Sequence, residues 1–140
     1  MSVGNLGLGV MIRMLGGNYA KSVAAHNGAL GKKIQKVEFG GDQLLIRFTD
    51  KTAITFEDKK QSCCEHRYMT NEGDTYEWAH LATFDGAEIK QAPSQDDPNG
   101  EAHDVQFLEI KTSKGVITIS SHNEHNGYYG GFSIEVSEVK

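Results

Sequence analysis

The sequence predicts a mostly β fold, with one domain of about seven antiparallel strands and a short helical segment near the N-terminus. Three observations lead to this prediction. Segments in which apolar and polar residues alternate recur from residue 34 onward, and this period of two is typical of half-buried strands. Turn-forming residues separate the segments, as in FGGDQ, FTDKT and TSKGV. A chain of 140 residues has the size of one ordinary domain, so we expect a single domain over residues 1–140.

The first 30 residues form a glycine-rich segment that precedes the predicted β domain of residues 31–140. Two stretches in this segment could be helical, residues 11–15 and residues 20–31, the second ending at Gly28 or Gly31. Because glycine destabilises a helix interior, we expect any helix here to be short.

Seven short segments carry the strand pattern. They cover residues 34–39, 43–49, 52–57, 87–92, 104–112, 116–120 and 132–139. Residues 68–86 mix polar and aromatic side chains without a clear period. Residues 91–103 contain both prolines of the chain and are expected to form a long surface loop.

Two parts of the chain follow a similar plan and could be related halves. Each reads as a strand, a hairpin and then a polar segment that contains a Glu-His pair, Glu65-His66 in the first and Glu124-His125 in the second. If the halves are related, the two polar segments leave the sheet at equivalent places and could line one site. The sequence leaves open whether they meet within one chain or across a dimer.

Charge and cysteine content exclude several classes of function. The net charge is −5, and no dense Lys/Arg cluster is present, so we expect no binding to duplex nucleic acid. No apolar run is long enough to span a membrane, and the N-terminus is a poor signal peptide. The two cysteines, Cys63 and Cys64, are adjacent and rarely pair in that arrangement, so reduced thiols in the cytoplasm are expected.

The segment SHNEHNGYYGGF, residues 121–132, is the strongest candidate for a binding loop. Its glycines permit sharp turns and close approach of a ligand to the backbone, its tyrosines offer faces for base stacking, and its histidines and asparagines supply directional hydrogen bonds. Together these groups suit a nucleotide. The competing interpretation is a tight loop whose polar side chains satisfy backbone groups. The candidate ligand-binding residues are His122, Asn123, His125, Asn126, Tyr128 and Tyr129.

The segment QSCCEHRYM, residues 61–69, is the second candidate. Arg67 would pair with a phosphate, and Tyr68 joins it as a candidate ligand-binding residue. An enzyme would use the same segments, with His125 or His66 as general base, Glu124 or Glu65 to orient it, and Cys64 as nucleophile. Adjacent cysteines lack the usual spacing of zinc ligands, so we expect no metal and no cofactor.

The stretches SCCEHRYM, FDGAEI and HNEHNGYYGGF resemble a poorly characterised family of small phage and bacterial proteins, over roughly residues 30 to 138. The family label implies no activity. By analogy of size and ligand chemistry, it is similar to phage anti-defence sponges, which sequester cyclic-nucleotide or ADP-ribose-derived signals of bacterial immunity. For a phage-encoded chain this implies a place in the host cytoplasm.

The leading hypothesis is therefore a homo-oligomeric protein that sequesters a nucleotide-derived immune signal without turnover. One alternative is a hydrolase that uses histidine and cysteine to cleave such a signal. A second alternative is a protein that binds and inhibits a host factor through its tyrosine-rich loop.

Overall fold

The computed structural model describes residues 19–40, 42–58, 65–71, 76–91, 95–96, 102–125 and 134–139. Its elements are α2 (Tyr19–Ala29), β1 (Ile34–Gly40), β2 (Gln43–Phe48), β3 (Ala53–Asp58), β4 (Glu65–Asn71), the 3-10 helix η1 (Glu77–Ala79), β5 (Phe84–Gln91), β6 (Gln95–Asp96), β7 (Ala102–Thr112), β8 (Gly115–His125) and β9 (Ile134–Val139). The prediction of a mostly β fold with a short N-terminal helix is confirmed.

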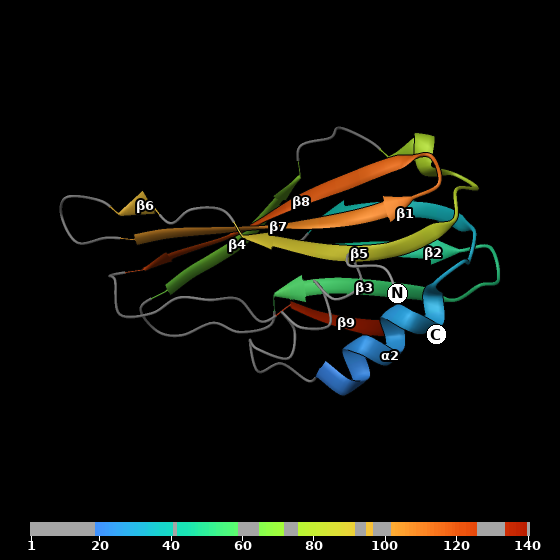
Figure 1. The fold of residues 1–140 in the computed structure, drawn as a ribbon, viewed down its shortest axis with the longest axis horizontal. Coiled ribbons are helices and arrows are strands. Elements are labelled where there is room, and N and C mark those ends of the chain that lie inside the picture. The colour runs from blue at the N-terminus through green and yellow to red at the C-terminus, as the bar shows by residue number, and fades with distance from the viewer. Residues whose placement is uncertain are drawn as a thin grey trace.

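The strands form two antiparallel sheets, which Figure 1 shows lying one over the other. One sheet has the order β1-β2-β3-β9. The other has the order β4-β8-β7-β5, and β6 pairs with β7 beside this path. Because antiparallel sheets commonly bury one face and expose the other, the alternating segments of the sequence fit this arrangement.

The core lies between the two sheets and is made of their apolar inward-facing side chains. Phe84 of β5 is fully buried, and its ring meets those of Phe48 and Phe56 from the other sheet at centroid distances of 6.0 and 6.5 Å. The core also includes Leu44, Ile46, Leu108, Ile110, Ile117, Ile119, Ile134 and Val136.

Helix α2 covers one open side of the sandwich, against the terminal strands β9 and β5. One of its side chains accepts a backbone hydrogen bond from each of these strands. The Val136 N–H of β9 donates to Ser22 Oγ at 3.0 Å, and the Ala87 N–H of β5 donates to His26 Nε2 at 3.0 Å. Each bond occupies one donor on an edge that could otherwise pair with another chain.

The predicted hairpins are present, and the β7–β8 turn shows why glycine is required there. Gly115 has a φ of 154°, and a Cβ at this position would lie 3.1 Å from the ring of Trp78. The Thr112 hydroxyl donates to the carbonyl of Gly115 at 2.7 Å and so closes the turn. A side chain at position 115 would displace the indole.

Three expectations need correction. Residues 65–71 carry no predicted strand, yet β4 occupies them. The strand expected to end at residue 120, with a loop from 121, continues as β8 to His125. The long loop expected over residues 91–103 contains β6 and the start of β7. The possible helix at residues 11–15 lies outside the described residues.

These corrections share one cause, which is that the missed strand segments are polar. Figure 1 shows that the ends of β4, β7 and β8 farthest from the β7–β8 turn reach beyond the four-stranded sheet. These strand ends do not face the other sheet, so they need fewer apolar residues. The alternation of apolar and polar residues on which the strand prediction depends is therefore weak there.

The two proposed halves do share a strand order, since β1-β2-β3 and β5-β7-β8 are both three neighbouring antiparallel strands. Their polar segments meet within one chain, because β4 pairs with the far half of β8. Among the described residues, no helix is both long enough and apolar enough to cross a membrane.

Candidate functional site

The pairing of β4, β8 and β7 gathers aromatic and polar side chains on the outer face of the five-stranded sheet. Tyr68 lies opposite His122, and His66 lies opposite Glu124, which in turn lies opposite His103 of β7. Residues directly opposite in an antiparallel pair share a face of the sheet. We call the following six residues the ring cluster: His66, Tyr68, Thr70, His103, His122 and Glu124.

Four aromatic rings of the cluster form a row across the three strands. The Tyr68 and His122 rings are stacked, with centroids 4.5 Å apart and planes within 5°. His66 lies 5.0 Å from Tyr68, and His103 lies 5.2 Å from His122, with tilts of 41° and 34°. The Tyr68–His122 stack covers one face of each of these two rings, and a planar ligand could stack on the partly exposed ring surface that remains.

A short hydrogen bond fixes one side of the row. The Tyr68 hydroxyl donates to Glu124 Oε2 at 2.6 Å. This bond lowers the pKa of Glu124 and raises the pKa of Tyr68 to about 12, so the pair is a carboxylate and a neutral phenol at neutral pH. Glu124 is exposed and can accept further hydrogen bonds from a ligand.

A second chain of hydrogen bonds runs through His122. Its Nε2 lies 3.0 Å from Thr70 Oγ1, and its Nδ1 lies 3.0 Å from His103 Nε2. Partial burial lowers the pKa of His122, and the nearby His103 lowers it further. His122 is therefore neutral at physiological pH, so one of its ring nitrogens accepts within this chain of hydrogen bonds and the other donates.

Arg67 and Asn123 lie on the opposite, inner face of the same sheet. Arg67 Nη1 donates to Asp58 Oδ1 at 3.1 Å and to Oδ2 at 3.2 Å, and both side chains are only 5% exposed. Asn123 lies opposite Arg67 and is fully buried. The structure therefore does not bring Arg67 together with Tyr68 and His122 in one site, and it assigns the guanidinium to a buried ion pair.

A comparison with protein families matches residues 27–134 to DUF7448, a domain of unknown function. The chain belongs to this family. No curated protein and no solved structure matches the chain.

All six residues of the ring cluster lie within the DUF7448 region. Four of the six, Tyr68, His122, Glu124 and His66, are predicted site residues, and the structure brings these four together. Thr70 and His103 are not among the predicted residues, because residues 68–86 show no period and His103 lies in a stretch expected to be a loop. The only sequence feature that could have marked Thr70 and His103 is that each side chain can donate or accept a hydrogen bond beside a polar strand.

For the other predicted site residues of this DUF7448 chain, the structure gives either the backbone position alone or no position. The backbone of His125 pairs with that of Glu65 at the end of the β4–β8 ladder. Cys64, Asn126, Tyr128 and Tyr129 lie outside the described residues, as does Cys63. Within the described parts of the chain, no group of three or more His, Cys, Asp or Glu side chains is arranged to hold a metal ion.

Proposed function

We propose that this DUF7448 protein binds a nucleotide-derived small molecule on the ring cluster and holds it without turnover. The observation that carries the proposal is the row of four rings centred on the Tyr68–His122 stack. A purine or pyrimidine has two flat faces, and stacking on protein aromatic rings contributes about 1–3 kcal/mol per base. A partly exposed row of rings on a rigid sheet suits this use.

The polar members of the cluster define which part of the nucleotide is recognised. The Glu124 carboxylate and the Thr70 hydroxyl can hydrogen-bond ribose hydroxyls or base edges. The cluster contains no lysine or arginine, and Arg67 is paired with Asp58 on the other face. We therefore expect the base and sugar to supply most of the affinity, and the phosphate little of it.

For a phage-encoded chain, this binding would be the sequestration expected of an anti-defence sponge, with a cyclic nucleotide or an ADP-ribose derivative as the ligand. A flat, partly exposed surface buries only one side of a small molecule. Tight capture would be favoured if a second copy covered the other side, which supports the expectation of a homo-oligomer.

The test begins with the purified full chain and a panel of nucleosides, ordinary nucleotides, cyclic dinucleotides and ADP-ribose derivatives. Thermal unfolding is followed with each compound, because a ligand that binds only the native state raises its stability. The protein is then denatured, and the released compound is analysed. Stabilisation with intact ligand recovered supports capture. No stabilisation by any compound contradicts it and favours a protein partner.

Matched variants then locate the site. Tyr68→Ala should weaken binding about five- to 150-fold, which corresponds to the loss of one stacking contact of about 1–3 kcal/mol. Glu124→Gln should weaken binding of ribose-containing ligands more than that of free bases. Glu109→Gln is the control, since Glu109 lies on the same strand network, farther along the outer face, and pairs with Lys90. Equal affinities in all three variants would place the ligand elsewhere.

A hydrolase is the second candidate, favoured by the chain Thr70–His122–His103. A hydroxyl, a histidine and a third group that orients the histidine are the parts of an activated nucleophile. His122 Nε2 would accept the proton of Thr70 or of a water. Recovery of cleaved ligand from wild type, and of intact ligand from His122→Ala, would establish this function in place of capture.

A further inference from the structure

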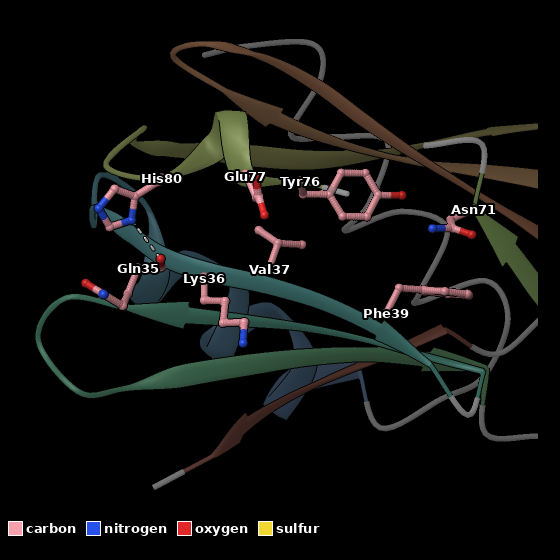
Figure 2. A pocket seen from close by; sticks show the side chains of 8 residues that line it. All are labelled: Gln35, Lys36, Val37, Phe39, Asn71, Tyr76, Glu77 and His80. Atoms are coloured by element: carbon pink, nitrogen blue, oxygen red, sulfur yellow. Dashed lines mark hydrogen bonds between the residues drawn. The ribbon is translucent and has the colours of Figure 1, made fainter. Parts of the chain in front are cut away.

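A groove of about 530 Å³ lies on the side of the sandwich opposite to α2. Its walls come from β1, from the end of β4 and from η1 with its flanking residues, and they are Gln35, Lys36, Val37, Phe39, Asn71, Tyr76, Glu77 and His80. Figure 2 shows Val37 pointing from β1 toward Glu77 and Tyr76, with the Tyr76 hydroxyl directed toward Asn71. The groove does not overlap the ring cluster.

Strands β1 and β4 are the terminal strands of the two sheets on this side. Parts of their edges are already occupied. Ile34 exchanges backbone hydrogen bonds with Leu81 and Ala82, and the His80 ring lies 2.9 Å from the carbonyl of Gln35. The Met69 N–H of β4 donates to Asp42 Oδ1 at 3.1 Å.

The remaining part of the β1 edge has no such partner among the described residues. Gly40 and Gln43 are the closing pair of the two-residue β1–β2 hairpin, and closing pairs exchange backbone hydrogen bonds. By alternation along the ladder, Glu38 and Lys36 also bond to β2. Val37 and Phe39 therefore direct their N–H and C=O groups away from β2, toward the free edge.

Beside this edge, two side chains have no partner for one of their polar groups within the described part of the chain. Tyr76 is only 9% exposed, and its hydroxyl has no hydrogen-bond partner within the described structure. A buried hydroxyl left unpaired destabilises the unoccupied groove, so an occupant that pairs with it gains affinity. Glu77 is exposed at the mouth of the groove and forms no ion pair with any described residue.

We propose that this groove binds an extended peptide segment of a partner protein, which adds to the four-stranded sheet as a new strand beside β1. Only an extended backbone can match the donors and acceptors of Val37 and Phe39 together. A bulky side chain of the peptide packs against Val37, Phe39 and the Tyr76 ring, and a neighbouring Lys or Arg pairs with Glu77. The unsatisfied edge and the Glu77 carboxylate, which has no ion-pair partner among the described residues, thus define one class of occupant.

The first experiment selects from a display library of short random peptides on the immobilised full chain. The same selection on a Val37→Pro variant is the comparison. Proline removes the outward N–H and is tolerated on an edge strand whose N–H faces away from its neighbour. Circular dichroism checks that the variant keeps its fold. We expect sequences with a bulky residue near a Lys or Arg to be enriched on wild type alone.

The second experiment measures the affinity of synthetic copies of the enriched peptides. N-methylation at alternate peptide residues should weaken binding at least about tenfold at one set of positions and have little effect at the other, because only one set faces β1. Tyr76→Phe and Glu77→Gln should each weaken binding, whereas the control Glu138→Gln on β9 should not. These point variants test the site even if Val37→Pro fails to fold.

No enrichment on wild type would overturn the proposal. An equal loss of affinity for the two sets of N-methylated peptides would also overturn the proposal. A peptide held by its side chains alone would show no difference between alternate positions. Binding by a peptide that is unaffected at Tyr76 and Glu77 would place it on another surface and would equally reject the assignment.

Discussion

Arg67 and Asp58 illustrate how burial decides the role of a charged residue. Both side chains are 5% exposed, and they face each other across β4 and β3. Removing one member of a buried ion pair leaves the other charge without compensation and costs about 3–5 kcal/mol. We therefore expect Arg67→Ala to lower the free energy of unfolding by about that amount, as measured by urea denaturation.

The double variant Arg67→Met with Asp58→Leu is the matched control. It removes both charges and keeps apolar volume, a replacement that is often neutral or stabilising for a buried pair. Recovery of stability in the double variant would show that the cost arises from the unpaired charge. An Arg67→Ala protein as stable as wild type, with nucleotide binding lost, would instead restore Arg67 as a ligand-binding residue.

The sequence predicted the chemical character of the site better than its geometry. The density of aromatic and polar residues predicts Tyr68 and His122 as ligand-binding residues and, in the enzyme alternative, Glu124 as the group that orients a histidine. Arg67 and Asn123 carry the same polar signal but occupy the inner face. Neighbours on a strand point to opposite faces, so separating the two groups requires knowing that both segments are strands and how they pair.

Among the elements, α2 depends on the protonation state of His26. This side chain is 3% exposed, its Nε2 accepts a hydrogen bond from the Ala87 N–H, and its Nδ1 lies 2.9 Å from Asn27 Oδ1. Burial lowers the pKa of His26, and only the neutral ring can accept the Ala87 bond. Protonation would leave the β5 edge without its acceptor.

The lowered pKa gives a stability that depends on pH. Between the native pKa of His26 and the unfolded value of about 6.5, the unfolded chain binds more protons, so the free energy of unfolding falls as the pH drops below about 6.5. Above that pH the full stability is present. The His26→Gln variant keeps a side-chain acceptor for the Ala87 N–H and removes the titrating imidazole. Its urea unfolding should therefore depend less on pH than that of wild type between about pH 7.5 and about pH 5.

The pKa of His122 is also lowered, so its protonation also reduces the free energy of unfolding as the pH falls. His122 is present in both proteins, so the difference between the pH profiles of wild type and His26→Gln reports the contribution of His26 in the helix. Identical pH profiles for the two proteins would show that His26 protonation is not coupled to unfolding.

The elements that could be predicted from sequence are those with one apolar face. β1, β2, β3 and the first half of β8 lie over the core, and their alternating residues placed them within one or two positions. β4 has no such face. His66, Tyr68 and Thr70 lie on one side, and Arg67 accompanies Met69 on the other, so hydrophobic period gives no signal. Backbone pairing with β8 determines this strand.

At the scale of the whole molecule, the two sides of the sandwich differ in what covers the terminal strands of the sheets. On one side helix α2 lies against the terminal strands, with Ser22 accepting one N–H of β9 and His26 accepting one N–H of β5. On the other side, the described residues pair with parts of the β1 and β4 edges and leave the Val37–Phe39 stretch of β1 without a backbone partner on this edge. Natural sheets usually protect their edges against pairing with other chains. A stretch left open beside a groove therefore supports a binding role for that side, separate from the ring cluster on the outer face.

Phe84 links the parts of the molecule into one cooperative unit. Its ring contacts Phe48 and Phe56 of the opposite sheet and lies 5.5 Å from the His26 ring of α2. We expect Phe84→Ala to lower the free energy of unfolding by about 3–5 kcal/mol, the usual range for truncating a buried phenylalanine.

Because both sheets and the helix share this contact, the whole molecule should unfold in one transition. The fluorescence of Trp78, the only tryptophan, and far-UV circular dichroism should therefore report the same urea transition. In Phe84→Ala both probes should shift together to lower urea. A Trp78 transition separated from the circular dichroism transition would mean that the two sheets unfold independently, and Phe84 would then stabilise only its own sheet.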